Sequence, residues 1–276
     1  MIEYSRIGSG APVVCLHGWP GGPSDYRELA PLLAGVADVI VPHLLGFADS
    51  FSAADVDRPA SAFGRDAQVA AVVELMDALS LEPAVLVGYD VGSTTALALA
   101  RAHPDRVRAL VLGNAIHPGA AGLALDDDHR AEFWYQDFHQ LAMAPGLVGG
   151  SVDAVRTYLD HFWSHWGHRS VAVATDDLVS QYARTGAFGV SLNWYRSGSG
   201  TLATALAARG SEPPSPLDVP APVLWGCRDP LFPTRFSEGL PELLPQVQVR
   251  ELDDVGHFVP LEAAEETAEA VREHLA

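Results

Sequence analysis

Hydrophobic residues gather in short continuous runs that are separated by longer stretches of mixed character. The clearest runs lie at 12–16, 39–41, 85–87, 109–112, 222–225 and 247–250. Runs of this length are typical of strands buried on both faces, as in a parallel sheet covered by helices. Helical patterns lie between them at 66–79 and 93–103, and a last helix is expected at about 262–275. The alternation predicts an α/β fold, with a mostly parallel sheet and helices on both faces.

The segment 117–210 interrupts this alternation, because it contains no comparable apolar run. It is rich in aromatic residues, and a proline-rich stretch at 211–216 follows it. We therefore predict that 117–210 is a helical cap, inserted into a core domain formed by residues 1–116 and 211–276. Most cap aromatics should pack together, but some must line the cleft against the sheet, which predicts an apolar substrate.

Charge and composition exclude several classes of function. The formal net charge of −18 argues against nucleic acids and anionic membrane surfaces as partners. No run of about 18 apolar residues and no signal peptide are found, so we expect a cytoplasmic protein without a membrane span. His161, His165 and His168 have helical spacing, but no carboxylate or cysteine completes a set, and no metal site is predicted.

The most informative motif is the pentapeptide Gly-Tyr-Asp-Val-Gly at 88–92, between an apolar run and a helical pattern. It has the form of a nucleophile elbow, a tight turn that presents one side chain at the tip of a strand. Glycines on both sides allow the sharp turn. The central residue is Asp90, which is an anion at neutral pH and needs no base to act as a nucleophile. A carboxylate is suited to displacement at a saturated carbon, such as that of an epoxide or alkyl halide, and would form an alkyl ester.

A second motif, His-Gly-Trp-Pro at 17–20, directly follows the first predicted strand. A turn at this place can direct the backbone N–H of Trp19 at a developing oxyanion. The N–H of Val91 can approach the same oxygen from the opposite side. These two groups are the candidate oxyanion hole.

Two further residues complete a constellation around the elbow. Asp229 follows the run at 222–225, and His257 follows the last run. Asp229 is the candidate acid that orients His257, with Asp253 and Asp254 as rivals because they lie nearer in sequence. Asn114 also follows a strand but cannot supply a carboxylate. The order of nucleophile, acid and histidine along the chain is the order found in α/β-hydrolases.

These motifs resemble the α/β-hydrolase fold family over nearly the whole chain, and within it the epoxide hydrolase branch. The segment Leu-Asn-Trp-Tyr-Arg at 192–196 is similar to the cap segment that carries one ring-opening tyrosine in that branch. The segment Trp-Tyr-Gln at 134–136 is similar to the segment that carries the other. The resemblance implies that Tyr135 and Tyr195 donate hydrogen bonds to the epoxide oxygen.

Other aromatic residues of the cap bear on this assignment. Trp134 and Trp194, beside the two tyrosines, are expected to contact the substrate. Tyr158 and Tyr182 also lie in the cap, and either is an alternative to Tyr135.

The implied reaction is cofactor-independent hydrolysis of a small apolar or aromatic epoxide to a vicinal diol. Asp90 would form the ester, and His257, oriented by Asp229, would activate the water that cleaves it. No metal or organic cofactor is needed for this chemistry. A homodimer is compatible with the sequence.

Two rival functions share most of these residues. A haloalkane or haloacid dehalogenase would use the same triad, but Val91 stands where haloalkane dehalogenases carry a tryptophan that donates to the halide. A non-catalytic, ligand-binding member of the fold is the rival of a different class. An intact triad with two cap tyrosines argues against it.

Overall fold

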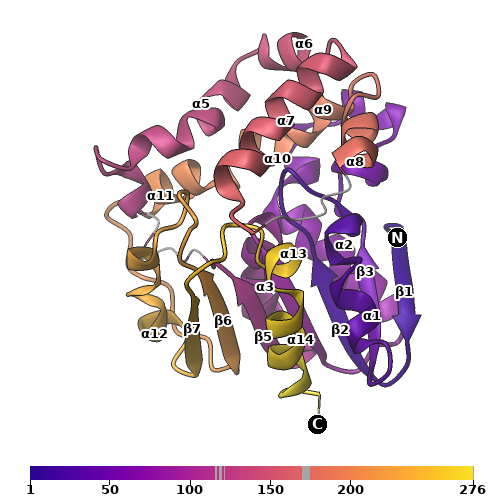
Figure 1. Ribbon diagram of the computed structural model, residues 1–276, viewed down its shortest axis with the longest axis vertical. Coiled ribbons are helices and arrows are strands. Elements are labelled where there is room, and N and C mark those ends of the chain that lie inside the picture. The colour runs from indigo at the N-terminus through magenta and orange to yellow at the C-terminus, as the bar shows by residue number, and fades with distance from the viewer. Residues whose placement is uncertain (116, 118–119, 121, 170–174, 276) are drawn as a thin grey trace.

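The fold is a central sheet with helices on both faces and a layer of further helices above the carboxyl ends of its parallel strands (Figure 1). The computed structural model describes residues 1–275 except 116, 118–119, 121 and 170–174. The strand order is β1-β3-β2-β4-β5-β6-β7, with β1 antiparallel to β3 and the other neighbours parallel. The strands are β1 Tyr4–Gly8, β2 Ala11–Leu16, β3 Ala37–Pro42, β4 Ala84–Tyr89, β5 Val107–Gly113, β6 Ala221–Gly226 and β7 Val247–Leu252.

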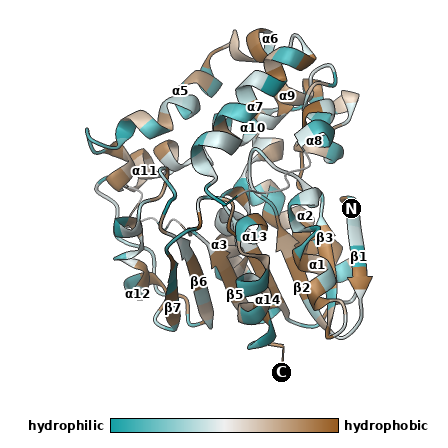
Figure 2. Cartoon of the chain, in the orientation of Figure 1, coloured by the Kyte–Doolittle hydropathy of each residue, from teal (hydrophilic) through white to brown (hydrophobic). Residues whose placement is uncertain are grey.

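The six apolar runs all form strands, so the predicted α/β architecture is confirmed. The strand that the runs did not reveal is β1, which lies at one edge of the sheet and is mostly exposed. An exposed edge strand needs no continuous apolar sequence, and this explains why no apolar run predicted β1. Figure 2 shows β2, β5 and β6 as a largely hydrophobic centre.

Alternation along each strand divides the core into two layers. Val14 of β2 belongs to the hydrophobic cluster that contains Leu99 of helix α3, Val91–Ala102. Its neighbour Val13 belongs to the second cluster, with Val271 of helix α14, Ala264–Arg272. Successive side chains of a strand point to opposite faces, so one apolar run serves both layers.

The remaining core helices are short apart from α2. They are α1 Leu29–Leu33, α2 Arg65–Ala78, α12 Leu240–Leu243 and α13 Val259–Glu262. Short 3₁₀ helices lie in the connections, at Pro23–Tyr26, Ala48–Ser50, Ala53–Asp57, Ala60–Phe63, Pro104–Arg106, Gly122–Leu125, Arg130–Phe133 and Thr234–Ser237.

The segment between β5 and β6 forms the upper helical layer, as the absence of apolar runs led us to expect (Figure 1). Its longest helix, α7, is capped by Ser151, whose Oγ accepts a hydrogen bond from the N–H of Ala154. The residues that this helix buries recur at helical spacing; they are Val155, Leu159, Phe162, Trp163 and Trp166. The boundaries 117 and 210 stay a prediction. The helices of this layer are α5 Trp134–Gln140, α6 Ala144–Val148, α7 Val152–Trp166, α8 Thr175–Tyr182, α9 Ala187–Ser191, α10 Asn193–Arg196 and α11 Thr201–Ala208.

The C-terminal helix differs from the expected 262–275. It is divided into α13 and α14 by Ala263, whose backbone (φ −136°, ψ 51°) is not helical. Glu262, at the end of α13, turns its carboxylate back onto the preceding loop, where it accepts backbone N–H groups. The sequence pattern could not show this break, because the residues on both sides are good helix formers.

Candidate active site

The pentapeptide at 88–92 joins β4 to α3 as a tight turn with Asp90 at its apex. Asp90 has a strained backbone (φ 51°, ψ −119°), which places its side chain beyond the strand tip. A Cβ on Gly92 would lie 1.8 Å from the carbonyl oxygen of Leu16, and one on Gly88 would lie 2.6 Å from the carbonyl carbon of Gly92. Both glycines are therefore needed for strand and helix to approach this closely.

Asp90, His257 and Asp229 come together at the carboxyl ends of the strands. His257 Nδ1 lies 2.7 Å from Asp229 Oδ2, and His257 Nε2 lies 3.6 Å from Asp90 Oδ2. The side chains of His257 and Asp229 are fully buried, whereas that of Asp90 is 11% exposed. The imidazole thus stands between two carboxylates, and its Nε2 edge faces Asp90.

The rival acids lie elsewhere. Asp254 is at the surface and pairs with Arg169, and the backbone carbonyl of Asp253 accepts a hydrogen bond from Arg228. Only tertiary packing separates these candidates from Asp229, because all three follow strand ends.

Asn114, set aside because it has no carboxylate, is part of the same hydrogen-bonded group. Its Nδ2 donates to Asp229 Oδ2 at 2.5 Å, and its Oδ1 accepts the N–H of Gly226 at 2.6 Å. The N–H of Leu231 donates to Asp229 Oδ1 at 2.7 Å. Asn114 therefore joins the ends of β5 and β6 and fixes the acid. The signal that could have revealed it was its place after the strand next to the elbow strand.

The two carboxylates control the charge of His257. Burial by itself lowers the pKa of the imidazole, but the charge of Asp229, the hydrogen bond to it and the nearby Asp90 outweigh burial, so the pKa is raised above its ordinary value. At neutral pH the imidazolium form is thus favoured while both carboxylates are charged.

Trp19 supplies a backbone donor to the elbow, in the place that the second motif predicts. Its N–H donates to Asp90 Oδ1 at 2.9 Å. Val91 is the first residue of α3, where the N–H has no acceptor within the helix, and it lines the cavity above Asp90. One carboxylate oxygen is therefore held by a backbone donor, and Oδ2 is the oxygen on the His257 side.

The turn that carries Trp19 is held from both sides. From the upper layer, Trp163 Nε1 donates to the carbonyl of Pro20, and the Tyr182 hydroxyl donates to the carbonyl of Gly21, both at 2.8 Å. These contacts link the helical layer directly to the predicted oxyanion hole.

From the core side, the turn is held by a buried carboxyl group. Asp25 Oδ2 accepts the Tyr89 hydroxyl at 2.7 Å and the N–H of Gly22 at 3.1 Å. Burial raises the pKa of Asp25 to about 7, although both hydrogen bonds act in the opposite direction. Because Tyr89 precedes the nucleophile candidate, this contact ties the turn to the elbow.

Tyr135 and Tyr195 face the same cavity as Asp90, together with Trp194 and Phe232. The two phenol rings lie edge to face with centroids 5.7 Å apart. Gln136 Nε2 donates to the Tyr135 oxygen at 3.0 Å, which leaves the phenol proton available for another acceptor. Burial is the main cause of a raised pKa in both tyrosines, so both remain protonated donors.

The other predicted aromatic residues lie away from this cavity. The Tyr158 hydroxyl bonds to His139 Nε2 at 2.9 Å, and the Tyr182 hydroxyl is occupied by Gly21. Trp134 is 42% exposed and stacks on Phe162. The structure therefore brings Trp194 to the cavity but not Trp134, because α5 turns neighbouring residues to different sides.

Glu262 is a site residue that no sequence pattern indicated. Its carboxylate, buried in the loop around His257, accepts four backbone N–H groups at 2.8–3.1 Å. Two of them, from Gly256 and Phe258, flank the histidine, and two, from His168 and Arg169, follow helix α7. One carboxylate thus fixes the histidine loop and joins it to the upper layer.

The remaining histidines do not form a metal site within the described chain. His165 Nε2 lies 2.9 Å from Glu132 Oε2, and its ring stacks on that of His161. Among the described residues, no three histidine, cysteine or acidic side chains are grouped to hold an ion. None of the described helices is both long and apolar enough to cross a bilayer.

The fold and the elbow define the class of protein. The model of the α/β-hydrolase fold family matches residues 11–264, and the chain belongs to this family. The protein is accordingly a hydrolase of the α/β fold, as the motifs led us to expect.

Three individual hydrolases are similar to this chain in sequence or in fold. A soluble epoxide hydrolase from a Corynebacterium species is 27% identical over 95% of this chain and 88% of its own length. A 2-hydroxymuconate semialdehyde hydrolase from a Pseudomonas species is 42% identical, but over only 42% of this chain and 39% of its own length. The crystal structure of an epoxide hydrolase from Bacillus megaterium shares the fold, with a TM-score of 0.83 at 18% identity, and the match covers 99% of this chain and 96% of that one.

Proposed function

We propose that this hydrolase opens an apolar epoxide to a vicinal diol through an alkyl ester on Asp90. The observation that carries the proposal is the shared cavity: a carboxylate at the elbow faces two buried, protonated phenols. The long alignment with the Corynebacterium epoxide hydrolase supports the same activity.

In the first step Asp90 attacks an epoxide carbon with Oδ2, while Oδ1 keeps its hydrogen bond from the Trp19 N–H. The carbon–oxygen bond of the three-membered ring breaks, and negative charge grows on the departing oxygen. Tyr135 and Tyr195 donate to that oxygen, as an oxyanion hole does. The product is a hydroxyalkyl ester.

The second step depends on the charge of His257. When Asp90 becomes a neutral ester, one of the two negative charges that favour the imidazolium disappears, and the pKa of His257 falls. The ring-opened oxygen takes a proton from a phenol, which solvent reprotonates, and His257 releases its proton to solvent. The proton count therefore balances, and the ester forms without the histidine. Neutral His257, oriented by Asp229, then takes a proton from water as it attacks the ester carbonyl. The N–H groups of Trp19 and Val91 hold the oxyanion.

A dehalogenase remains the nearest alternative, since it would share Asp90, Asp229 and His257. The epoxide reaction is favoured because the donors opposite Asp90 are phenols that can both stabilise and protonate an oxygen. A halide needs no proton, and Val91 adds no side-chain donor. Diol formation from a panel of epoxides, compared with halide release from haloalkanes and haloacids, separates the two activities.

A single turnover in ¹⁸O-labelled water tests the ester mechanism. With enzyme in excess, the first diol should contain unlabelled oxygen from Asp90, because the attacking atom comes from the protein. Label should appear in the diol only after repeated turnovers. Label in the first diol would mean direct attack by water and would refute the ester.

A further inference from the structure

The cavity directly above Asp90 is too small for the expected substrate. Its volume is about 20 Å³, which is room for roughly one water molecule. Cavities that enclose small organic ligands are usually larger by at least tenfold. Any epoxide with a sizeable substituent must therefore extend into a neighbouring space.

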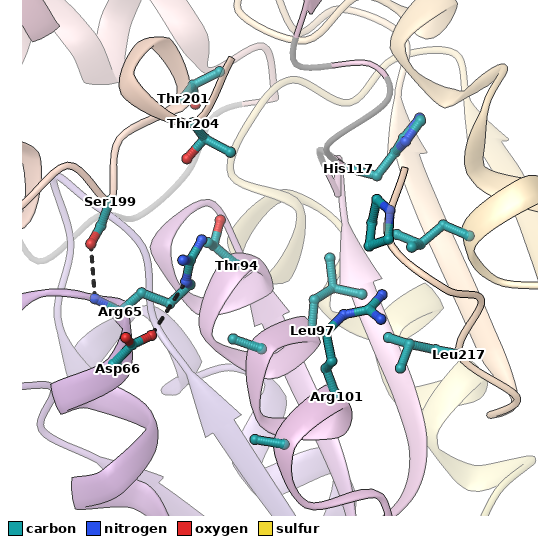
Figure 3. A pocket seen from close by; sticks show the side chains of 14 residues that line it. Arg65, Asp66, Thr94, Leu97, Arg101, His117, Ser199, Thr201, Thr204 and Leu217 are labelled. Atoms are coloured by element: carbon teal, nitrogen blue, oxygen red, sulfur yellow. Dashed lines mark hydrogen bonds and ion pairs between the residues drawn. The ribbon is translucent and has the colours of Figure 1, made fainter. Parts of the chain in front are cut away.

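Such a space lies along helix α3. A chamber of about 390 Å³ is bounded by Leu97 and Ala98 of α3 on one side and by Leu217 and Leu243 on another, so much of its wall is apolar. Figure 3 shows Leu97 and Leu217 on neighbouring segments, with the side chain of Arg101 drawn between them.

The chamber shares part of its wall with the cavity above Asp90. Thr94, Ser199 and Thr201 line both spaces. Thr94 is one helical turn after Asp90, and its Oγ1 donates to the Asp90 carbonyl at 3.3 Å. Ser199 lies two residues before helix α11, and Thr201 is the first residue of that helix. These three residues lie where the two spaces adjoin.

Polar groups lie at the rim of the chamber. Arg65 pairs with the exposed Asp66, and Arg101 donates to the carbonyl of Ser215 at 2.8 Å. Both guanidinium groups therefore have partners of their own, and neither is a free charge that demands an anionic ligand. Thr94 and Arg101 both line the chamber, and between them helix α3 rises roughly 10 Å along its axis.

A second depression next to the site offers no such connection. It shares Gln136, Tyr195 and Gly200 with the cavity above Asp90. These residues pack tightly, because a Cβ on Gly200 would lie 2.7 Å from Gln136 Oε1 and 3.0 Å from Tyr195 Cδ1. These contacts leave little space beside Gly200 for a substrate chain.

We infer that the chamber along α3 binds the substituent of the substrate, and that the preferred substrates are epoxides with an elongated apolar chain. The epoxide ring would sit between Asp90 and the two phenols, with the chain passing Thr94 toward Leu97 and Ala98. This inference rests on the proposed function. It adds a binding subsite and a substrate shape that neither the triad nor the cap tyrosines specify.

The test fills the chamber with a larger side chain and varies the length of the substrate's alkyl chain. Ala98 is partly buried and lines the chamber, so Ala98→Phe should occupy it without touching Asp90, His257 or the tyrosines. The control is Ala70→Phe, which makes the same change on an exposed position of α2. The substrates are 1,2-epoxyalkanes from epoxybutane to epoxydecane.

For the unchanged protein, kcat/KM should rise about fourfold with each methylene that enters the chamber, and then level off. Ala98→Phe should lower kcat/KM at least about tenfold for epoxydecane and leave epoxybutane within about twofold, while Ala70→Phe changes neither. Retained turnover of epoxybutane also shows that the variant is folded. Equal losses for both substrates, or no dependence on chain length in the unchanged protein, would overturn the inference.

Binding of the diols separates this inference from the proposed function. By calorimetry, 1,2-decanediol should bind the unchanged protein at least about tenfold more tightly than 1,2-butanediol, and Ala98→Phe should remove that difference. If no epoxide is turned over but decanediol binds more tightly than butanediol, the chamber subsite is supported and the proposed reaction is refuted. If epoxides are turned over but the two diols bind equally, the inferred chamber subsite is refuted and the proposed reaction is retained. Should Ala98→Phe not fold, Ala98→Leu provides the same comparison with a smaller loss of space.

Discussion

The two sides of the candidate site are held in different ways. On the sheet side, Asp229 and Glu262 accept directed hydrogen bonds from the backbone, and His257 is fixed between them. On the cap side, Tyr135 and Tyr195 are held largely by ring contacts, with Trp19 stacked on Tyr135 at 5.7 Å. Hydrogen bonds fix distances and angles, whereas apolar packing fixes shape. The sheet side should thus tolerate change poorly, and the cap side should adapt to different substrates.

Substitution of His257 should have the largest effect on turnover, and it should block ester hydrolysis while sparing ester formation. His257→Gln should reduce turnover by about 10⁴-fold or more, because the ester can form but water is not activated. Intact-protein mass spectrometry should show a mass increase equal to one substrate molecule. The control is Asp90→Asn, which should form no adduct. An inactive His257 variant without an adduct would mean that the histidine acts before the ester forms.

Removal of the cap donors should have the next largest effect and should act on the first step alone. Tyr135→Phe and Tyr195→Phe should each slow ester formation by about 5- to 150-fold, mostly below the roughly 100- to 1000-fold cost of one oxyanion donor because the second phenol remains. Ester hydrolysis, measured by rapid quench, should keep its rate. Tyr158→Phe is the matched control, since its hydroxyl bonds to His139 away from the cavity. Ring opening at the normal rate in both variants would disprove the donor assignment.

Glu262→Gln should weaken the sheet side without touching a reacting atom. An amide can no longer accept all four N–H groups, so we expect a loss of about 1–3 kcal/mol in the free energy of unfolding. Ester hydrolysis should slow more than ester formation, because the loop carries His257. The control is Glu266→Gln, which loses only a partly exposed ion pair with Arg169 and should cost about 1 kcal/mol or less. Equal slowing of both steps would contradict a role in positioning the histidine.

The smallest effect on activity is expected at Asp25, and it should appear as a pH dependence of stability. The folded-state pKa of Asp25 is raised to about 7, so between about pH 4 and 7 the folded protein binds more protons at this group than the unfolded chain. This group therefore makes stability fall as pH rises through that window. Asp25→Asn should remove this component from urea unfolding measured at pH 4–8, with kcat within about threefold of normal. An identical pH profile in both proteins would contradict the raised pKa.

The elbow could be predicted from sequence because its requirements are local. Glycines at 88 and 92 permit a turn that the structure shows to be closely packed, and Asp90 sets the type of nucleophile. The strands from β2 to β6 were readable for a similar reason, since burial on both faces demands a continuous apolar run, whereas β7 lies at an edge and is mostly exposed. The order of Asp90, Asp229 and His257 followed from their places after β4, β6 and β7.

Local sequence patterns were enough to predict the α/β-hydrolase fold, the carboxylate at the elbow and the chain order of the candidate triad. Tertiary structure alone decided that Asp229, and not Asp253 or Asp254, lies beside His257, and that Asn114 and Glu262 fix this pair. It also decided which cap tyrosines face Asp90 and opened the chamber along α3. The physical reason is distance along the chain. A turn or a buried strand is specified by neighbouring residues. A contact between side chains on different strands and loops depends on how the whole core packs, whether the two lie 28 residues apart, as Asp229 and His257 do, or 115 apart, as Asn114 and Asp229 do.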